Sequence, residues 1–429
     1  MGSLSMLTKR EITKKYAREY AAASKKARGR MLDELVATTG WSRANARRQV
    51  SSAGARRGPQ RAAKRALRAR TYGYDTLKLL IRVWMLAGQP SGKYLAATMG
   101  IWLPKLIEHG EFGDDTHRLN GHTQAQLLTV SGATIDRLLK PTGATIDRLL
   151  KPTRDGMRLT GISGTKAGPL LRTSITVRKA GDEHEQTPGF CEIDLVLHCG
   201  PTLKGEFCRS LTVTDVHTGW TENIALKNGA HRWVLEAMPI IEARLPFRLT
   251  GIDSDNGGEF INEALIGWAQ ERDLFFTRAR PYHSNDNAHV EQKNGDVVRR
   301  HAFHYRYDTA AELRLLNELY ALVRVRLNLF TGTTKAIGYR TNRNGKSVRV
   351  YDKPRTPHQR LIDSGVLTAE KTAELAALFQ STNPAELTRQ ITAIQTRLIH
   401  LAAAKTAAIS AGVSRAKPGE ARTHLSRAS

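Results

Sequence analysis

Apolar and polar residues recur with helical spacing over residues 10–53. Two helical stretches meet within this segment, and Gly40 is suited to form the turn between them. Ser42 is a suitable N-cap for the second stretch because its hydroxyl can accept a hydrogen bond from a free backbone N–H. Residues 1–55 are therefore predicted to form a helix-turn-helix module. A small helical hairpin with a solvated basic face is the alternative.

A second helix-turn-helix-like pattern extends over residues 74–153. Within it, the segment Gly-Ala-Thr-Ile-Asp-Arg-Leu-Leu-Lys-Pro-Thr at 132–142 is repeated without change at 143–153. Proline lacks a backbone N–H and interrupts helices, so each copy is expected to form a short helix that stops at Pro141 or Pro152. One copy would then be an insertion beside the original helix.

Between residues 188 and 305 the pattern changes to short apolar runs that alternate with amphipathic segments. The resulting order is strand, strand, strand, helix, strand, helix, strand, helix, which is the order of the ribonuclease H fold. The strands are expected at 190–198, 207–216, 220–226, 247–255 and 274–279, and the helices at 230–245, at 258–272 and around residue 291.

The remaining segments connect or extend these parts. Residues 56–73 are predicted to be a basic arm, 154–187 a linker, 306–410 a helical and basic region with a basic loop or small β element at 331–357, and 411–429 a disordered basic tail. The predicted fold class is multidomain. It has all-α helix-turn-helix modules at the N-terminus, a central α/β ribonuclease H-like catalytic domain, and a helical, basic C-terminal region.

The net charge of the chain indicates which classes of partner it can bind. Lys and Arg number 66 against 40 Asp and Glu among 429 residues, a net charge of +26. Such an excess favours a nucleic acid partner, because basic side chains displace the counterions condensed on it. A membrane surface is the weaker alternative, since no apolar run reaches the length of a membrane span and no signal-type stretch opens the chain. We expect a cytoplasmic, nucleoid-associated protein. The three cysteines form no Cys-x-x-Cys pair, so they support neither a disulfide framework nor a zinc site.

Three carboxylates stand out in the predicted α/β domain. Asp194 lies in the middle of an apolar strand, Asp255 at the end of the strand expected beside it, and Glu291 on the following helix. Burying an unpaired carboxylate in an apolar strand costs several kcal/mol of stability, so Asp194 is expected to be paired, for example as a ligand of a metal ion. Hard oxygen ligands suit Mg²⁺ or Mn²⁺, and two such ions can cut a phosphodiester. Spacing alone carries little weight among so many acids. Nearby acids are expected to be structural: Glu192, Asp215, Asp253 and Asp286.

Two groups of basic and polar residues are candidates for DNA contacts. The second helix of the N-terminal module would present side chains that can read bases and phosphates in the major groove, namely Arg43, Asn45, Arg47 and Arg48. The arm that follows can run along the phosphate backbone or enter the minor groove through Arg56, Arg57, Arg61, Lys64, Arg65, Arg68 and Arg70. A plain solvated linker is the alternative for the arm.

The blocks around the three acids resemble the DDE transposases of bacterial insertion sequences, which have a retroviral-integrase-type core. The matching pieces are Glu-Ile-Asp at 192–194, Asp-Ser-Asp-Asn-Gly-Gly-Glu-Phe at 253–260 and Asn-Asp-Asn-Ala-His-Val-Glu-Gln-Lys-Asn at 285–294. The resemblance places the catalytic and metal-binding triad on Asp194, Asp255 and Glu291. It also implies DNA contacts from Lys293 and Asn294 beside the triad.

The chain departs from that family in two places. The His-His-Cys-Cys zinc module of retroviral integrases is absent from the sequence, and a tail motif common in relatives is present only loosely, from Asn328 onward. The resemblance nonetheless implies two Mg²⁺ or Mn²⁺ ions as cofactors. It implies double-stranded DNA as partner, both element ends and target, and a homo-oligomer on that DNA.

The predicted function is that of a transposase, which hydrolyses a phosphodiester at an element end and joins the freed 3′-OH to target DNA. Two alternatives remain open at this point. One is a catalytically silent helix-turn-helix protein derived from a transposase, because the 11-residue duplication could disable this copy. The other is a ribonuclease H-fold nuclease that only hydrolyses, although the basic segments on both sides of the core favour transposition.

Overall fold

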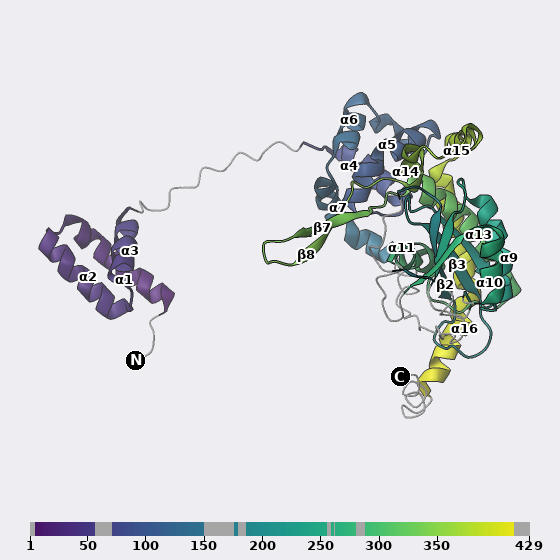
Figure 1. Ribbon diagram of the computed structural model, residues 1–429. Coiled ribbons are helices and arrows are strands. Elements are labelled where there is room, and N and C mark those ends of the chain that lie inside the picture. The colour runs from purple at the N-terminus through teal and green to yellow at the C-terminus, as the bar shows by residue number, and fades with distance from the viewer. Residues whose placement is uncertain are drawn as a thin grey trace. The chain divides into compact units, whose positions relative to one another are not determined.

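The computed structural model describes residues 5–55, 71–149, 176–178, 186–254, 259–260, 262–279 and 288–415. Only the backbone is described at 54–55, 141–149, 176–178, 279, 288–289, 291 and 413–415. The chain divides into two compact units, Met1–Thr71 and Tyr72–Ser429, which are labelled by their elements in Figure 1. Within the described ranges no helix is long and apolar enough to cross a membrane.

The N-terminal unit is a bundle of three helices, α1 (Met6–Ala22), α2 (Lys25–Thr39) and α3 (Arg43–Ala55). As expected, Gly40 ends α2 with a left-handed φ of 68°, where its N–H reaches the carbonyl of Val36. Ser42 precedes α3, and its hydroxyl accepts a hydrogen bond from the N–H of Asn45 at 3.3 Å. The helices enclose a small core of Ala17, Leu32, Leu35, Ala46 and Val50.

The second unit begins with a helical part: α4 (Tyr74–Leu86), α5 (Gly92–Glu108), η1 (Gly113–Arg118), α6 (Gly121–Thr129) and α7 (Gly132–Leu149). The first turns of α5 and α7 approach closely, because a Cβ on Gly92 would lie 2.1 Å from the carbonyl oxygen of Gly132. The N–H of Gly92 donates to Asp136 at 2.7 Å across the same contact. Glycine at both positions therefore allows the two helices to cross.

Helix α7 corrects the expectation for the tandem repeat. It runs without a break from Gly132 to Leu149, so it passes through Pro141 and includes most of the second copy. The φ angle of proline is compatible with a helix, so the helix can continue, at a cost of about 3 kcal/mol from one lost hydrogen bond and the clash of the ring with the preceding turn. Pro104 in α5 and Pro239 in α9 (His231–Arg244) also lie inside helices of this chain. Pro152 lies outside the described residues.

The centre of the second unit is a six-stranded mixed sheet with the order β1-β6-β5-β2-β3-β4. Its strands are β1 (Thr176–Arg178), β2 (Phe190–Leu197), β3 (Arg209–Asp215), β4 (Thr221–Leu226), β5 (Gly251–Ser254) and β6 (Phe275–Ala279). β2, β3 and β4 pair antiparallel, whereas β5 pairs parallel with β2 and with β6.

The arrangement of β2 to β6 agrees with the predicted ribonuclease H-like order. β1 was not predicted: its residues lie in segment 154–187, which was expected to be a linker. It pairs parallel with β6, from Thr176 opposite Thr277 to Arg178 opposite Ala279.

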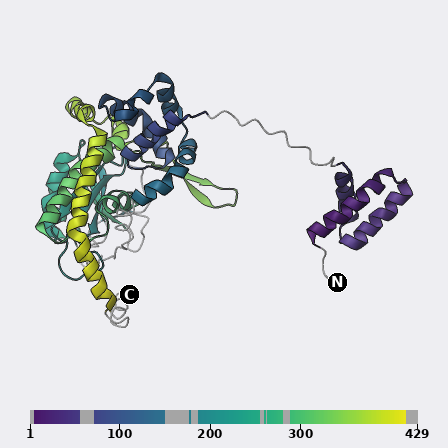
Figure 2. The ribbon, with the colours of Figure 1, turned by 180° about the vertical axis from the view of Figure 1, so that it is seen from behind.

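Helices α9 (His231–Arg244) and α10 (Glu263–Glu271) connect the later strands. β6 is followed by α11 (Ala288–Lys293), the π-helical segment η3 (Asn294–Arg299), and α12 (Arg300–Ala302). The C-terminal part comprises α13 (Ala310–Val325), the π-helical segment η4 (Arg326–Phe330), the hairpin β7 (Ala336–Thr341) and β8 (Ser347–Tyr351), α14 (Pro357–Ser364), α15 (Ala369–Ser381) and α16 (Pro384–Arg415). Figure 2 shows α16 as the long yellow helix that runs past the sheet.

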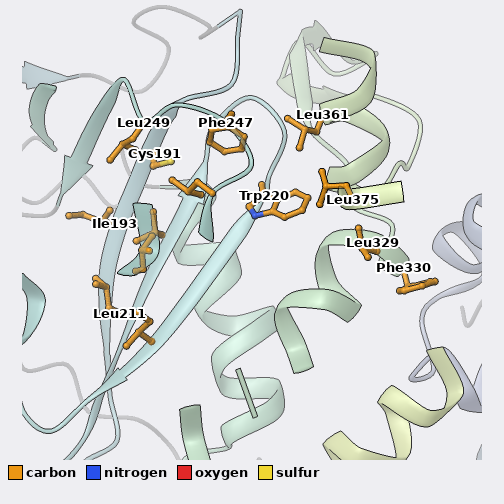
Figure 3. Packing of buried hydrophobic residues seen from close by; sticks show 14 of the residues in the cluster. Cys191, Ile193, Leu211, Trp220, Phe247, Leu249, Leu329, Phe330, Leu361 and Leu375 are labelled. Carbon is orange, nitrogen blue, oxygen red and sulfur yellow. The ribbon is translucent and has the colours of Figure 1, made fainter. Parts of the chain in front are cut away.

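One hydrophobic core joins the helical part, the sheet and the C-terminal helices. In Figure 3, Ile193 and Leu211 on the sheet lie in the same cluster as Leu361 and Leu375 from α14 and α15. Trp102 of α5 is buried there, and its indole N–H donates to the carbonyl of Phe330 at 2.9 Å. The helices of residues 74–149 therefore fold together with the sheet and do not form a separate compact unit.

Candidate active site

β2 carries two acids on one face of the sheet, because Glu192 and Asp194 are two residues apart on the same strand. Asp194 is half-buried, and its two neighbours in the strand, Ile193 and Leu195, are buried on the opposite face. One of its carboxylate oxygens accepts a hydrogen bond from the N–H of Leu195 at 2.7 Å. Its other oxygen accepts one from the amide nitrogen of Asn294 at 2.5 Å. The carboxylate is thus held from two sides.

The helix that carries Glu291 is attached to β2 at both ends. At its start, the N–H of Val290 donates to Oε2 of the buried Glu192 at 2.9 Å. At its end, Asn294 donates to Asp194. Asn294 is also the first residue of the π-helical segment η3, a geometry that is frequent at functional sites. Glu291 lies in the chain between these two attachments, and its side chain is outside the described residues.

The pairing of β2 with β5 fixes the position of the residue before Asp255. Ser254, the last residue of β5, lies opposite Ile193, the residue before Asp194. Asp255 itself belongs to residues 255–258, which the structure does not describe. The structure therefore places Asp194 in full and the backbone of Glu291, and for the third acid it places only the preceding residue, Ser254.

The described donors fit a hard divalent cation. The amide oxygen of Asn294 is buried and accepts no hydrogen bond from the residues that the structure describes. It belongs to the amide group whose nitrogen donates to Asp194, so the Asp194 carboxylate and a second hard oxygen donor lie on two side chains in contact. No group of three or more His, Cys, Asp or Glu that could hold a metal occurs among the described residues, but Asp255 and the side chain of Glu291 are not among them.

Asp253 and Asp215 have structural contacts, in line with the roles predicted for them. The hydroxyl of Thr277 donates to Asp253 at 2.5 Å, which joins β6 to β5. Asp215 accepts hydrogen bonds from the N–H of Gly189 at 2.8 Å and from the N–H and hydroxyl of Thr218 at 2.7 and 2.5 Å. Burial raises the pKa of Asp215, although these hydrogen bonds oppose the shift. Asp286 lies outside the described residues.

Lys293 was expected to contact DNA, but in the structure its side chain is buried. Its side chain is buried with 7% exposure, and desolvation lowers the pKa of its amine to about 8. It follows the buried Val290 by three residues, so the two lie on the same side of the helix. Its amine lies 3.9 Å from the position that a Cβ would take on Gly219, in the turn between β3 and β4. In this conformation the amine is not available to a phosphate.

Three of the four candidates on α3, Arg43, Asn45 and Arg48, have contacts within the N-terminal unit. Arg43 forms an ion pair with Asp33 of α2, and it donates to the carbonyl of Gly29 at 3.3 Å. Arg48 donates to the amide oxygen of Asn45 at 3.1 Å, and Arg47 is exposed. The arm residues Arg56, Arg57, Arg61, Lys64 and Arg65 lie outside the described residues.

Glu192 and Asn328 make structural contacts that could not be predicted from the sequence. Glu192 was expected to be structural, but its link to the helix of Glu291 was not visible. Asn328 is buried in η4 and uses its amide to bond both the N–H and the carbonyl of Thr221, at 3.0 and 2.9 Å. The only indication in the sequence was that Asn328 begins a loosely matching motif. In the structure, Asn328 attaches η4 to the start of β4.

The fold and these contacts define a protein with a ribonuclease H-like sheet and an acidic face on its central strand. The chain is 33% identical over 356 residues to the uncharacterized protein y4rM of Sinorhizobium fredii (strain NGR234), and the alignment covers 82% of this chain and 95% of that protein. The chain belongs to the same family as y4rM. No family model matches it.

Among solved structures, the chain is similar to the catalytic core domain of BIV integrase. That comparison covers 41% of this chain and 95% of the integrase core, with 16% sequence identity and a TM-score of 0.28. A similarity at this level does not extend to function.

Proposed function

We propose that the protein is a DNA transposase that hydrolyses a phosphodiester at the end of a DNA element and joins the freed 3′-OH to target DNA. The observation that carries the proposal is the double attachment of the Glu291 helix to β2. Val290 bonds to Glu192 at one end of that helix, and Asn294 bonds to Asp194 at the other. Glu291 is therefore one helical turn before Asn294, the residue that bonds the Asp194 carboxylate. The pairing of β5 with β2 sets Ser254, the residue before Asp255, opposite Ile193.

Asp194, Asp255 and Glu291 are the residues proposed to hold two Mg²⁺ or Mn²⁺ ions. Such ions activate the attacking oxygen and stabilise the leaving oxygen of an in-line phosphoryl displacement. Asn294 has the supporting role, because its amide nitrogen fixes one oxygen of Asp194, while its own amide oxygen is buried without a hydrogen bond from the described residues. The N–H of Leu195 fixes the other oxygen of Asp194. A carboxylate oriented from two sides needs little rearrangement when the substrate binds.

Duplex DNA is the proposed substrate and partner. The net charge of +26 supports it, as does a three-helix unit with the turn and cap of a helix-turn-helix. A homo-oligomer that pairs two element ends is part of the same proposal.

The test uses the full chain and labelled duplexes made from the DNA that flanks its coding sequence. With Mg²⁺ we expect strand cleavage at an element end and joined products in the presence of a second duplex. Asp194→Asn, Asp255→Asn and Glu291→Gln should each reduce both products by about 10²-fold or more while DNA affinity is retained. Asp296→Asn is the matched control, because it removes an exposed carboxylate from the adjoining η3 and should retain near-normal activity.

Three outcomes would contradict the proposal or its assignment of residues. Cleavage without joined products would indicate a nuclease that only hydrolyses. Specific DNA binding without any metal-dependent cleavage would indicate a DNA-binding protein with a silent core. Equal loss of activity in Asp296→Asn and Asp194→Asn would show that the carboxylates have been assigned wrongly.

A further inference from the structure

The hairpin of β7 and β8 projects from the second unit as a two-stranded ribbon (Figure 1). Both of its surfaces are largely exposed, including large side chains that an ordinary surface hairpin would not present. Ile337 is 59% exposed, Tyr339 67% and Tyr351 49%. An exposed apolar and aromatic surface of this kind is typical of an interaction site.

The ribbon is strongly and uniformly basic. Its exposed cations are Arg340, Arg343, Lys346, Arg349 and the adjoining Lys353. Residues 336–351 contain no acid, and Asp352 is the sole acid between residues 331 and 357. Because like charges repel, two ribbons from separate copies of the chain would not pack against each other readily. A polyanion is the partner that this charge fits.

One face of the ribbon combines a guanidinium with aromatic rings. Arg349 lies opposite Tyr339 in the strand pairing, and its side chain donates to the Tyr339 hydroxyl at 3.2 Å. The guanidinium carbon lies 6.0 Å from the centre of the Tyr339 ring. Tyr351 is two residues from Arg349 on the same strand and therefore on the same face. A planar cation held between tyrosines offers both charge and stacking surface to nucleic acid.

The base of the ribbon is rigidly fixed. Arg360 of α14 donates to the carboxylate of Asp352 at 2.9 Å and to the carbonyl of Thr333 at 2.7 Å, so it ties the two ends of the hairpin together. Asp352 also accepts from the N–H of Lys335 at 2.6 Å. The amine of Lys335 donates to the carbonyl of His217, in the turn between β3 and β4.

This attachment places the base of the ribbon close to the candidate active site. The turn that Lys335 contacts also lies beside Lys293, the residue that ends the helix of Glu291. DNA held at the candidate site would thus have its flank near the base of the ribbon. A two-stranded ribbon is narrow enough to enter the major groove of B-DNA, which is about 12 Å wide.

We propose that the β7–β8 ribbon is a second DNA-binding element, which enters a groove of duplex DNA and contacts its phosphates through Arg340, Arg343 and Lys346. The proposal rests on the proposed function, because that function places DNA at the candidate active site. Binding of DNA by the ribbon can nevertheless be measured without catalysis. It assigns to the ribbon a contact separate from that of α3 and the basic arm.

Binding is measured with the full chain and a fluorescent duplex from the flanking DNA, in buffer with EDTA and no divalent metal, over about 50 to 200 mM salt. The variant is Arg340→Gln, Arg343→Gln and Lys346→Gln combined. Its matched control removes the same charge from α13, α15 and α16, at the exposed Arg314 and Arg397 and the half-buried Lys371, as Arg314→Gln, Lys371→Gln and Arg397→Gln. We expect the ribbon variant to bind at least about 10-fold more weakly and to lose about 2 to 3 units of the slope of log K against log salt, at about 0.9 per phosphate contact. The control should change neither quantity appreciably.

The proposal is overturned if the ribbon variant and the control behave alike, or if the ribbon variant changes the oligomeric state and leaves the salt slope intact. The second result would identify another copy of the chain as the occupant. Should the triple variant fold poorly by circular dichroism, Arg343→Gln with Lys346→Gln at the tip gives the same test with about two contacts removed. Loss of the slope in a protein that never cleaves DNA would support the ribbon while contradicting the proposed function.

Discussion

Glu192 is the residue through which β2 positions the helix of Glu291. Its buried carboxylate accepts the N–H of Val290, so removing it leaves that N–H without its partner and the helix less firmly held. We expect Glu192→Ala to lower metal-dependent cleavage by about 10- to 100-fold, as for other residues that orient metal ligands. The Mg²⁺ concentration for half-maximal activity should rise, and affinity for DNA measured without metal should not change.

Glu192→Gln separates positioning from charge. The amide oxygen of Gln can accept the same hydrogen bond, so most of the activity should return in this variant. If Glu192→Ala and Glu192→Gln are equally impaired, the charge of the carboxylate matters in itself and Glu192 is closer to a metal ligand than to a support. If both are fully active, the attachment of the helix has no bearing on the reaction.

Single residues also differ in how far their roles can be predicted from the sequence. Asp194 could be singled out because an acid within an apolar strand needs a partner. That partner, Asn294, is 100 residues away and depends on how a helix packs on β2, which no local pattern records. Lys293 is a second example: the family resemblance implied a DNA contact, but the burial of its side chain depends on how the helix packs and is not visible in the sequence.

At the scale of elements, long and strongly patterned segments were predictable. The five strands β2 to β6 and the helices between them follow from apolar runs and amphipathic spacing. β1 is three residues long and is defined by its pairing with β6, so its own sequence carries no signal. The tandem repeat is a different case. Eleven residues make about three helical turns, so the second copy continues α7 on nearly the same face.

A pair of elements far apart in the chain is joined by Glu111, which follows α5. Arg389 of α16 donates to both of its carboxylate oxygens at 2.8 Å, and Asn383 donates to it at 2.6 Å. The hydrogen bonds from Arg389 lower the pKa of the Glu111 carboxyl to about 2. The Glu111 side chain is 9% exposed, whereas Arg389 is 48% exposed and screened by solvent.

We expect Glu111→Gln to lower the free energy of unfolding by about 1–2 kcal/mol near neutral pH. A folded-state pKa below the ordinary value near 4.5 stabilises the protein above that pH, and this stabilisation is lost as the pH falls from 4.5 towards 2. Urea unfolding at several pH values tests this, and the difference between wild type and Glu111→Gln should shrink over that window. Glu374→Gln, which removes an exposed ion pair of α15, is the control and should cost much less. A difference that stays constant down to about pH 2 would contradict the role of the ion pair.

At the scale of the whole molecule, the chain combines an N-terminal three-helix unit with a larger unit built around the sheet. The first unit is predictable from the sequence because its turn and cap residues are local. The core that the helices of residues 74–149 share with the sheet and the C-terminal helices is not predictable in this way, since the contact of Trp102 with Phe330 spans 228 residues. The proposed function divides its tasks in the same way: sequence recognition in the first unit, and chemistry in the second.

That division gives a prediction about specificity. Arg47 is exposed on α3, and base readout by such a side chain discriminates by about 1–3 kcal/mol. We therefore expect Arg47→Ala or Asn45→Ala in the full chain to reduce the preference for a flanking duplex over a scrambled one by about 5- to 100-fold. Arg61→Ala and Arg65→Ala in the arm should weaken binding to both duplexes equally and lower the salt slope by about 0.9 each. Arg18→Ala, on the exposed face of α1, is the control with one charge removed from the same unit. Competition binding with the two duplexes at several salt concentrations measures both effects. An arm variant that alters sequence preference while the α3 variants do not would reverse the assignment of recognition and phosphate binding.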